Sequence, residues 1–228
     1  MPITLYELSG SDRSQFFSPH CWKTKLALVH KQLPFKTEAV WFTEKEKFAM
    51  SKQSLLPVIS DGESIINDSW TIAEYLEDKY ADSPRLFADD EVKEKADTFN
   101  QWVSTVLSKH IPGILILELY NLLAEQDKEY FRQTREDRLG TSLETFAATP
   151  EKHIQGLQDE LASVRETLST QNYLGGDEPD YRDICLLGTF LWIANSSTKT
   201  FLNKDDVVYT WYQRALNDYR VAIPNSIK

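Results

Sequence analysis

The chain has little cysteine: two residues in 228, Cys21 and Cys185, far apart in the sequence. A disulfide framework needs several cysteines at short spacings, so a small disulfide-stabilised secreted domain is excluded. Sparse cysteine use fits a reducing compartment, and we expect a cytoplasmic protein. The N-terminus also lacks a basic segment followed by an apolar one, so no secretory signal is expected.

Clustered histidines, long apolar runs and excess positive charge are missing as well. The four histidines are dispersed without the spacing of metal ligands, so we expect no bound metal. The longest apolar stretch, around residues 184–194, is shorter than the roughly 20 residues that cross a bilayer. Twenty-five basic residues are scattered among 35 acidic ones, which gives a net charge of −10. We therefore expect neither a nucleic acid nor a membrane as partner.

What is present begins with the pattern of a mixed sheet. Apolar runs at residues 3–8 and 34–41 predict two strands, and residues 18 to about 31 between them predict a helix. A strand, a crossover helix and a second strand form a βαβ unit, so the two strands should be parallel. Asp61-Gly62 lies between two further apolar runs and predicts a β-hairpin.

Two predicted helix starts carry groups that suit a charged ligand. Ser18 lies at the cap position and Pro19 at the first helical position, where unpaired N–H groups and the serine hydroxyl could stabilise a sulfur anion. After the hairpin, Asp68 or Ser69 caps the next helix. Asp68 could bind the ammonium group of an α-amino acid, while Ser69 and the helix N–H groups take its carboxylate. For both sites, helix capping alone is the simpler interpretation.

The order of elements, with Ser-Pro-x-Cys at 18–21, Leu56-Pro57 before the third strand and Asp68-Ser69 after the fourth, closely resembles the glutathione transferase family. The resemblance covers nearly the whole chain. It implies an α/β thioredoxin-like N-terminal domain at residues 1–82 that binds glutathione. It also implies an all-α C-terminal domain at residues 91–228 that contributes a hydrophobic substrate site.

The same resemblance assigns the parts of a glutathione site. It implies that Pro57 is cis and that the backbone of Leu56 pairs with the cysteinyl part of glutathione. Asp68 and Ser69 would hold the γ-glutamyl end. The glycyl carboxylate should meet a basic side chain, for which the nearest candidates are Lys45 and Lys52.

Enzymes of this family lower the pKa of the glutathione thiol with a hydroxyl or sulfur group near the end of the first strand. Tyr6, Ser14 and Ser18 compete for this role, and we favour Ser18 as the catalytic residue because its hydroxyl and the helix N–H groups converge. Cys21 takes the resolving position of a redox motif whose attacking cysteine is replaced by Ser18. Its simpler interpretation is a buried, small apolar residue.

The string at residues 18–25 and the acidic composition resemble the fungal-specific class A transferases, which are related to bacterial glutathione-dependent β-etherases. This implies a homodimer that detoxifies xenobiotics, with a broad second site for aromatic or phenolic compounds. It also implies conjugation, with reduction of hydroperoxides or ether cleavage as side activities. The candidate lining residues of the second site are Phe16, Phe17, Trp22, Leu117 and Tyr120.

Two other functions remain open at this point. A ligandin-type protein would hold flavonoids or other phenolics without catalysis, and it needs the same glutathione site and the same hydrophobic cleft. A non-enzymatic interaction module, as in translation factors, would not need an intact glutathione site, so Leu56-Pro57 and Asp68-Ser69 argue against it.

The second half of the chain reads as helices. Asp180 and Asp183 form a variant capping box, and the helix that follows, residues 184–194, is apolar on all sides and should be buried. Residues 154–168 carry one apolar seam. Pro112-Gly113 should bend or break a helix.

Overall fold

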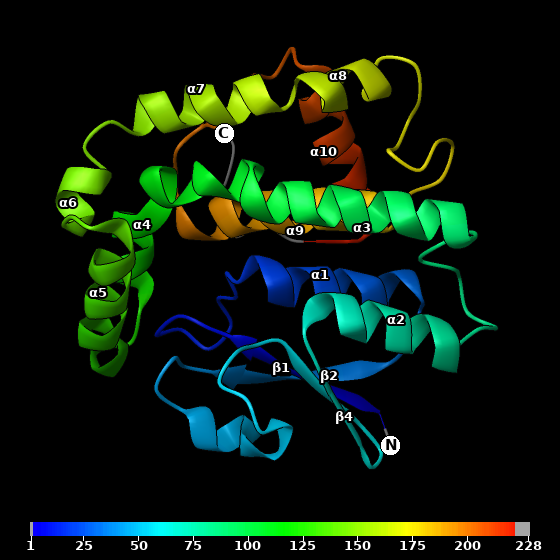
Figure 1. Ribbon diagram of the computed structural model, residues 1–228, viewed down its shortest axis with the longest axis horizontal. Coiled ribbons are helices and arrows are strands. Elements are labelled where there is room, and N and C mark those ends of the chain that lie inside the picture. The colour runs from blue at the N-terminus through cyan, green and yellow to red at the C-terminus, as the bar shows by residue number, and fades with distance from the viewer. Residues whose placement is uncertain (1, 222–228) are drawn as a thin grey trace.

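The computed structural model describes residues 2–221 and contains a four-stranded mixed sheet in the order β2-β1-β3-β4 (Figure 1). β1 and β2 are parallel, with Ile3 opposite Phe35 and Leu8 opposite Val40. β3 runs antiparallel to both β1 and β4. These pairings confirm the predicted parallel strands and the hairpin. The strands are β1 (Ile3–Leu8), β2 (Phe35–Val40), β3 (Val58–Asp61) and β4 (Ser64–Asn67).

Helices cover the sheet on both faces. The α-helices α1 (Pro19–His30) and α2 (Ser69–Lys79) lie between the sheet and the helical domain (Figure 1). A 3₁₀ helix, η1 (Lys45–Ser51), packs Phe48 into a separate small cluster with Val40 and Val58. Alternate side chains of a strand point to opposite faces of the sheet. Val58 therefore packs in this small cluster, while its neighbour Ile59 packs in the main core on the other face.

The helical domain is built around α9, in which almost every side chain is buried. α9 packs against α1 of the first domain and against α3, α4 and α10 of its own. The described elements of this domain are α3 (Asp90–Thr105), η2 (Leu107–Lys109), α4 (Ile111–Leu122), α5 (Glu125–Leu139), α6 (Leu143–Phe146), α7 (Pro150–Glu160), α8 (Ala162–Leu168), α9 (Tyr181–Ser196) and α10 (Val207–Asp218).

The junction between the two halves contains neither a helix nor a strand from the end of α2 at Lys79 to the start of α3 at Asp90. We propose residue 82, within this segment, as the end of the first domain, and residue 91, the second residue of α3, as the start of the second. None of the helices within residues 2–221 is both long and apolar enough to cross a membrane.

A glycine allows α1 and α9 to approach closely. A Cβ atom at Gly188 of α9 would lie 3.1 Å from the backbone nitrogen of Lys23 and 3.2 Å from the carbonyl oxygen of Pro19. These distances are shorter than ordinary van der Waals contacts, so a side chain at position 188 would push the two helices apart. The helix that begins at Ser18 is therefore seated directly on the buried centre of the other domain.

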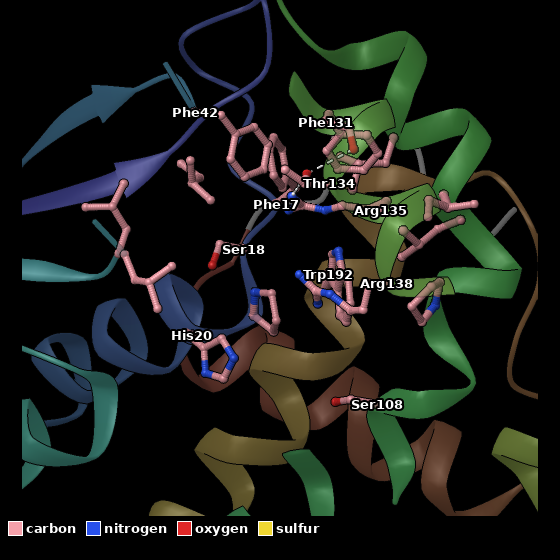
Figure 2. Close-up of a pocket in the computed structure, with 18 of the residues that line it drawn as sticks. Phe17, Ser18, His20, Phe42, Ser108, Phe131, Thr134, Arg135, Arg138 and Trp192 are labelled. Atoms are coloured by element: carbon pink, nitrogen blue, oxygen red, sulfur yellow. Dashed lines mark hydrogen bonds between the residues drawn. The ribbon is translucent and has the colours of Figure 1, made fainter. Parts of the chain in front are cut away.

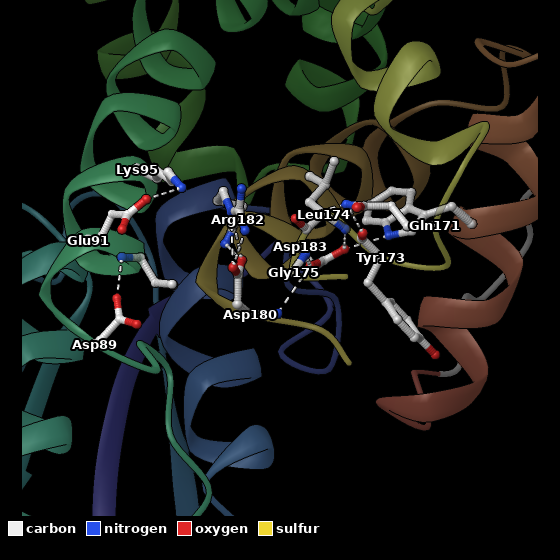
Figure 3. A network of polar contacts seen from close by, with 12 residues as sticks. Asp89, Glu91, Lys95, Gln171, Tyr173, Leu174, Gly175, Asp180, Arg182 and Asp183 are labelled. Atoms are coloured by element: carbon white, nitrogen blue, oxygen red, sulfur yellow. Dashed lines mark hydrogen bonds and ion pairs between the residues drawn. The ribbon is translucent and has the colours of Figure 1, made fainter. Parts of the chain in front are cut away.

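Asp180 and Asp183 form the predicted capping box of α9 (Figure 3). Asp180 accepts a hydrogen bond from the N–H of Arg182, and the buried Asp183 carboxylate accepts from the N–H of Asp180. Asp183 also accepts from the N–H groups of Leu174 and Gly175 and from the indole N–H of Trp211. The capping box therefore fixes both the start of α9 and the loop before it.

Two boundaries differ from the sequence prediction. Pro112-Gly113 does not break a helix, because Pro112 lies in the first turn of α4, where its missing N–H costs no intrahelical bond. The break falls instead at residues 106–110, which include η2. The apolar seam at residues 154–168 belongs to two helices, α7 and α8, interrupted at Leu161.

Hydrogen bonds of buried side chains join the domains, and two of these side chains hold the first domain near the cavity. The Asp127 carboxylate of α5 accepts from the N–H groups of Phe42 and Thr43, at 2.7 and 3.0 Å, and from the Thr43 hydroxyl at 2.7 Å. The Tyr181 hydroxyl of α9 donates to the carbonyl of Ser69 at 3.0 Å. The helical domain thereby fixes the loop after β2 and the start of α2.

Candidate active site

A cavity of about 880 Å³ lies between the two domains (Figure 2). Its first wall comes from the start of α1, the loop after β2 and the segment before β3. Its second wall comes from α4, α5 and α9. The first wall includes Phe17, Ser18, His20, Lys23, Phe42, Lys45 and Leu56, and the second wall includes Ile116, Phe131, Arg135, Arg138 and Trp192.

Ser18 is the N-cap of α1, as predicted. Its backbone is extended, with φ −67° and ψ 125°, and its hydroxyl oxygen accepts from the N–H of Cys21 at 3.4 Å. Accepting this bond leaves the hydroxyl proton available for another acceptor. Ser18 lines the cavity, so a bound anion there would meet both this proton and the partial positive charge of the helix start.

The two competing hydroxyls lie elsewhere. Tyr6 packs against the small cluster of Val40, Phe48 and Val58. Ser14 is exposed and donates to the Asp12 carboxylate at 2.7 Å. Neither of them is among the cavity-lining residues, whereas Ser18 is.

The Leu56-Pro57 peptide bond is cis, as the family resemblance implied. Leu56 lines the cavity and Pro57 is buried directly before β3. The backbone of Leu56 therefore borders the same space as the Ser18 hydroxyl. The position of Leu56 fits the role expected of it, pairing with the cysteinyl part of glutathione.

Asp68 is the N-cap of α2, with φ 69° and ψ 131°, a combination outside the left-handed helical region that few residues other than glycine adopt. Its Oδ1 accepts from the N–H groups of Trp70 and Thr71, both at 3.0 Å. The other carboxylate oxygen has no partner among the described residues and is available for an ammonium group. Ser69 is buried at the first position of α2, and neither Asp68 nor Ser69 lines the cavity itself.

His20 lines the cavity and is exposed. Desolvation and the nearby Lys23 ammonium lower the pKa of His20, and the Asp68 carboxylate opposes the shift. The shift favours the neutral imidazole, which can either donate or accept a hydrogen bond.

The two lysine candidates for the glycyl carboxylate are now distinguishable by position. Lys45 lines the cavity, and its ammonium nitrogen lies 5.2 Å from the centre of the Tyr130 ring. Lys52 is exposed and is not among the lining residues. Lys45 is the better placed of the two.

Of the five residues expected to line the hydrophobic site, the structure brings only Phe17 into the cavity. Trp22 is buried in the core and its indole N–H donates to the carbonyl of Phe16 at 3.2 Å. On α4 the lining residues include Ile116 and Leu119, whereas Leu117 and Tyr120 each follow by one residue and are not among them. One residue turns the side chain by about 100° around a helix, which explains the displacement.

The contribution of α5 to the cavity was not predicted from the sequence. Phe131, Arg135 and Arg138 line the cavity at the spacing i, i+4, i+7. This spacing is the signal that could have identified one face of a helix, but nothing in the sequence showed that the face meets the start of α1. Phe42 and Trp192, from a loop and from α9, were missed for the same reason.

Both cysteines are buried thiols. Cys21 and Cys185 are free and fully buried, and burial raises the pKa of each thiol to about 12. The interpretation of Cys21 as a buried small residue is confirmed. Within residues 2–221 no cluster of three or more His, Cys, Asp or Glu side chains has an arrangement that could hold a metal ion.

Comparison with known proteins identifies this arrangement. The model of the glutathione S-transferase C-terminal domain matches residues 96–214, and that of the N-terminal domain matches residues 17–79. The chain belongs to the glutathione S-transferase family. A curated zeta-class glutathione S-transferase of Euphorbia esula is 30% identical over 118 residues, which are 50% of this chain and 51% of the relative. The chain therefore matches about half the length of that relative.

Solved glutathione transferases share the whole architecture. GSTFuA3 of Phanerochaete chrysosporium superposes with a TM-score of 0.86 at 27% identity, covering 97% of this chain and 98% of that chain. GSTFuA2 of the same organism has a TM-score of 0.86 at 25% identity, covering 97% of this chain and 99% of that chain. A transferase of Ceriporiopsis subvermispora in complex with glutathione has a TM-score of 0.82 at 23% identity, covering 97% of this chain and 99% of that chain. At this level of identity the likeness shows the fold alone. The thioredoxin-like and helical domains and the likeness to fungal transferases are confirmed.

Proposed function

We propose that this glutathione transferase ionises the glutathione thiol with Ser18 and transfers the sulfur to a hydrophobic, aromatic or phenolic co-substrate. One observation carries the proposal: the Ser18 hydroxyl, the first turn of α1 and the apolar side chains of the helical domain line the same cavity. A thiolate at the helix start and a hydrophobic electrophile against the opposite wall would then meet in one space.

The roles of the first domain follow from its hydrogen-bonding groups. The Ser18 hydroxyl donates to the sulfur and stabilises the thiolate, which is the nucleophilic form. The Leu56 backbone aligns the cysteinyl part, and the unpartnered oxygen of Asp68 receives the ammonium group of the γ-glutamyl end. Ser69 takes the carboxylate of that end, and Lys45 the carboxylate of the glycyl end.

Aromatic side chains from both walls supply the co-substrate site. Phe17, Phe42, Phe131 and Trp192 offer aromatic surface, and the volume of about 880 Å³ suits a molecule of the size of a two-ring phenolic compound beside glutathione. Peroxidase and etherase activity remain predictions for this site, as do a homodimeric assembly, a role in detoxification and a cytoplasmic location.

Replacing Ser18 with alanine should lower kcat for glutathione conjugation at least about tenfold, because the hydroxyl that stabilises the thiolate is lost. The measurement is a conjugation assay with a small aromatic electrophile, together with the ultraviolet absorbance of bound thiolate as a function of pH. The pKa of bound glutathione should rise in the variant.

Ser14→Ala is the matched control, since Ser14 is an exposed serine four residues earlier that does not line the cavity. Ser18→Ala also removes a helix cap worth about 1 kcal/mol, so thermal unfolding is measured beside activity. Full turnover in folded Ser18→Ala would contradict the assignment. Absence of turnover in the unmodified protein, with phenolic ligands still bound, would favour the ligandin-type alternative.

A further inference from the structure

The cavity is positive although the molecule is negative. Acidic residues outnumber basic ones in the chain by 35 to 25. The described residues that line the cavity nevertheless include five basic side chains and no aspartate or glutamate: Lys23, Lys45, Lys109, Arg135 and Arg138. Low-dielectric walls of one charge sign concentrate the field, so this space favours an anion more than the surrounding surface does.

Three of these cations already have partners. Lys109 forms an ion pair with Glu160 at 2.9 Å, and Lys23 donates to the Asn100 side chain at 2.7 Å. Lys45, which lies over the Tyr130 ring, is the residue we assign to the glycyl carboxylate of glutathione. None of these three is free to recognise a second anion.

Arg135 and Arg138 differ, because neither has a carboxylate partner within residues 2–221. Their neighbour Arg132, on the same helix but outside the cavity, shows the usual situation for an arginine of this acidic protein. Arg132 pairs with Glu136 at 2.9 Å and with Glu144 at 2.8 Å. On this helix, the guanidinium group outside the cavity is paired with carboxylates. The two guanidinium groups that line the cavity have no carboxylate partner among the described residues.

The Arg135 guanidinium is partly desolvated. It donates to the Thr134 hydroxyl at 2.8 Å and lies 4.5 and 5.0 Å from the ring centres of Phe131 and Phe42. Burial lowers the pKa of Arg135 and the neighbouring Arg138 adds to the effect, yet arginine stays protonated at any physiological pH. Most of its five N–H donors remain available, and a desolvated cation without a counter-ion gains when an anion binds.

We propose that Arg135 and Arg138 select, as co-substrate, a molecule that carries a carboxylate on an aromatic body. The proposal rests on the proposed function, of which it defines the substrate class. Figure 2 shows Arg135 and Arg138 on the side of the cavity opposite Ser18, with Phe131 and Trp192 beside them. The planar guanidinium matches a carboxylate with two parallel hydrogen bonds, and the aromatic rings accommodate the apolar body.

A matched pair of probes separates charge from shape. We choose 4-isothiocyanatobenzoate and its methyl ester, which undergo the same addition at the isothiocyanate group. The glutathione sulfur forms a bond to the central carbon, the electron pair of the carbon–nitrogen π bond takes up a proton at nitrogen, and no group leaves. The product in both cases is a dithiocarbamate, so a difference in kcat/KM that remains after division by the uncatalysed rates reflects recognition of the carboxylate.

We expect kcat/KM for the acid to exceed that for the ester about tenfold after correction for their uncatalysed rates, the discrimination typical of one charge-assisted hydrogen-bonded pair. The ratio of the two values should fall about tenfold in Arg135→Gln or Arg138→Gln. Arg132→Gln, which removes the same charge from the same helix outside the cavity, should keep the ratio of the unmodified protein. An unmodified ratio near one, or an equal fall in Arg132→Gln, would overturn the proposal.

A binding measurement keeps the inference independent of catalysis. Calorimetry with 2-naphthoate and its methyl ester, without glutathione, should show tighter binding of the acid, and Arg135→Gln should abolish the difference. If neither isothiocyanate is conjugated but this preference for the acid persists, the proposed enzyme function fails and the anion-selective cavity stands. If the ester binds as well as the acid, the anion selectivity fails even where conjugation is observed.

Discussion

Glu44 joins the two loops that border the cavity. Its carboxylate accepts from Nη1 and Nη2 of Arg13 at 2.6 and 2.7 Å, and from the N–H of Trp41 at 2.9 Å. The hydrogen bonds from Arg13 are the main reason that the pKa of Glu44 is lowered to about 2 from an ordinary value of 4.5. The carboxylate is therefore favoured in the folded state.

Glu44→Gln should reduce the free energy of unfolding by about 1–2 kcal/mol at pH 7, since a bidentate charge-assisted pair is lost. Because the folded pKa lies below the unfolded one, the contribution of Glu44 is present above pH 4.5 and disappears as the pH falls toward 2. The difference between the unmodified protein and Glu44→Gln, measured by urea unfolding, should therefore be smaller at pH 4 than at pH 7.

Glu38→Gln is the control, because Glu38 is half exposed and pairs with Lys47 only at 3.7 Å. Glu38→Gln should change the free energy of unfolding by no more than about 0.5 kcal/mol at either pH 4 or pH 7. A Glu44→Gln difference that grew on acidification would show that the Arg13 pair does not stabilise the folded state.

Single residues were predictable where their role is local. Ser18 and Asp68 are helix caps, and a cap depends on a few neighbouring positions, so the sequence identified both. Arg135 and Phe42 carry no such local signal. Their placement in the cavity depends on how α5 and the loop after β2 pack across the domain junction, which no spacing within one segment encodes.

At the scale of elements, the start of α9 is held by a dense group of hydrogen bonds. One carboxylate, Asp183, accepts from three backbone N–H groups and from the Trp211 indole at distances of 2.7 to 3.1 Å. All four donors approach a side chain that is fully buried. The network therefore joins α9, the preceding loop and α10.

Asp183→Ala should lower the free energy of unfolding by about 3 kcal/mol or more, because several buried donors lose their acceptor together. Asp183→Asn keeps the size but offers a single acceptor oxygen, so its loss should be intermediate. Thermal and urea unfolding measure both. Unchanged unfolding of the alanine variant would mean that the capping network adds nothing to stability.

Element boundaries show where periodicity is a weak guide. An apolar seam at residues 154–168 predicts one helix, yet two helices meet at Leu161 without losing the alternation of steps of three and four. On α4 the predicted lining residues were one position away from the observed ones. A period of 3.6 fixes the width of a buried face but not which neighbour covers each part of it.

At the scale of the whole molecule, the site depends on the contact between domains. Asp127 is completely buried, and its carboxylate accepts three hydrogen bonds from the loop after β2. That loop provides Phe42 to the cavity, and α5 provides the opposing wall. Asp127 thus sets the separation of the two walls.

Asp127→Ala should cost about 2–4 kcal/mol of unfolding free energy, since the buried N–H groups of Phe42 and Thr43 lose their acceptor. Hydrogen exchange of these two amides should accelerate, and the KM for the co-substrate should rise. Asp137→Ala, an exposed aspartate of the same helix, should change none of the three. Unaltered exchange at Phe42 and Thr43 in Asp127→Ala would show that the loop is held by other contacts.

Gly188 has a consequence that reaches beyond stability. The backbone of α9 approaches α1 at Gly188, where no side chain intervenes. The helix that begins at Ser18 therefore packs directly on the buried central helix of the other domain. Other parts of the cavity lining, Phe42 and the residues of α5, come from a loop and a helix outside that centre. A lineage could therefore exchange one family of target compounds for another by altering those outer segments, while the chemistry of sulfur activation is inherited unchanged.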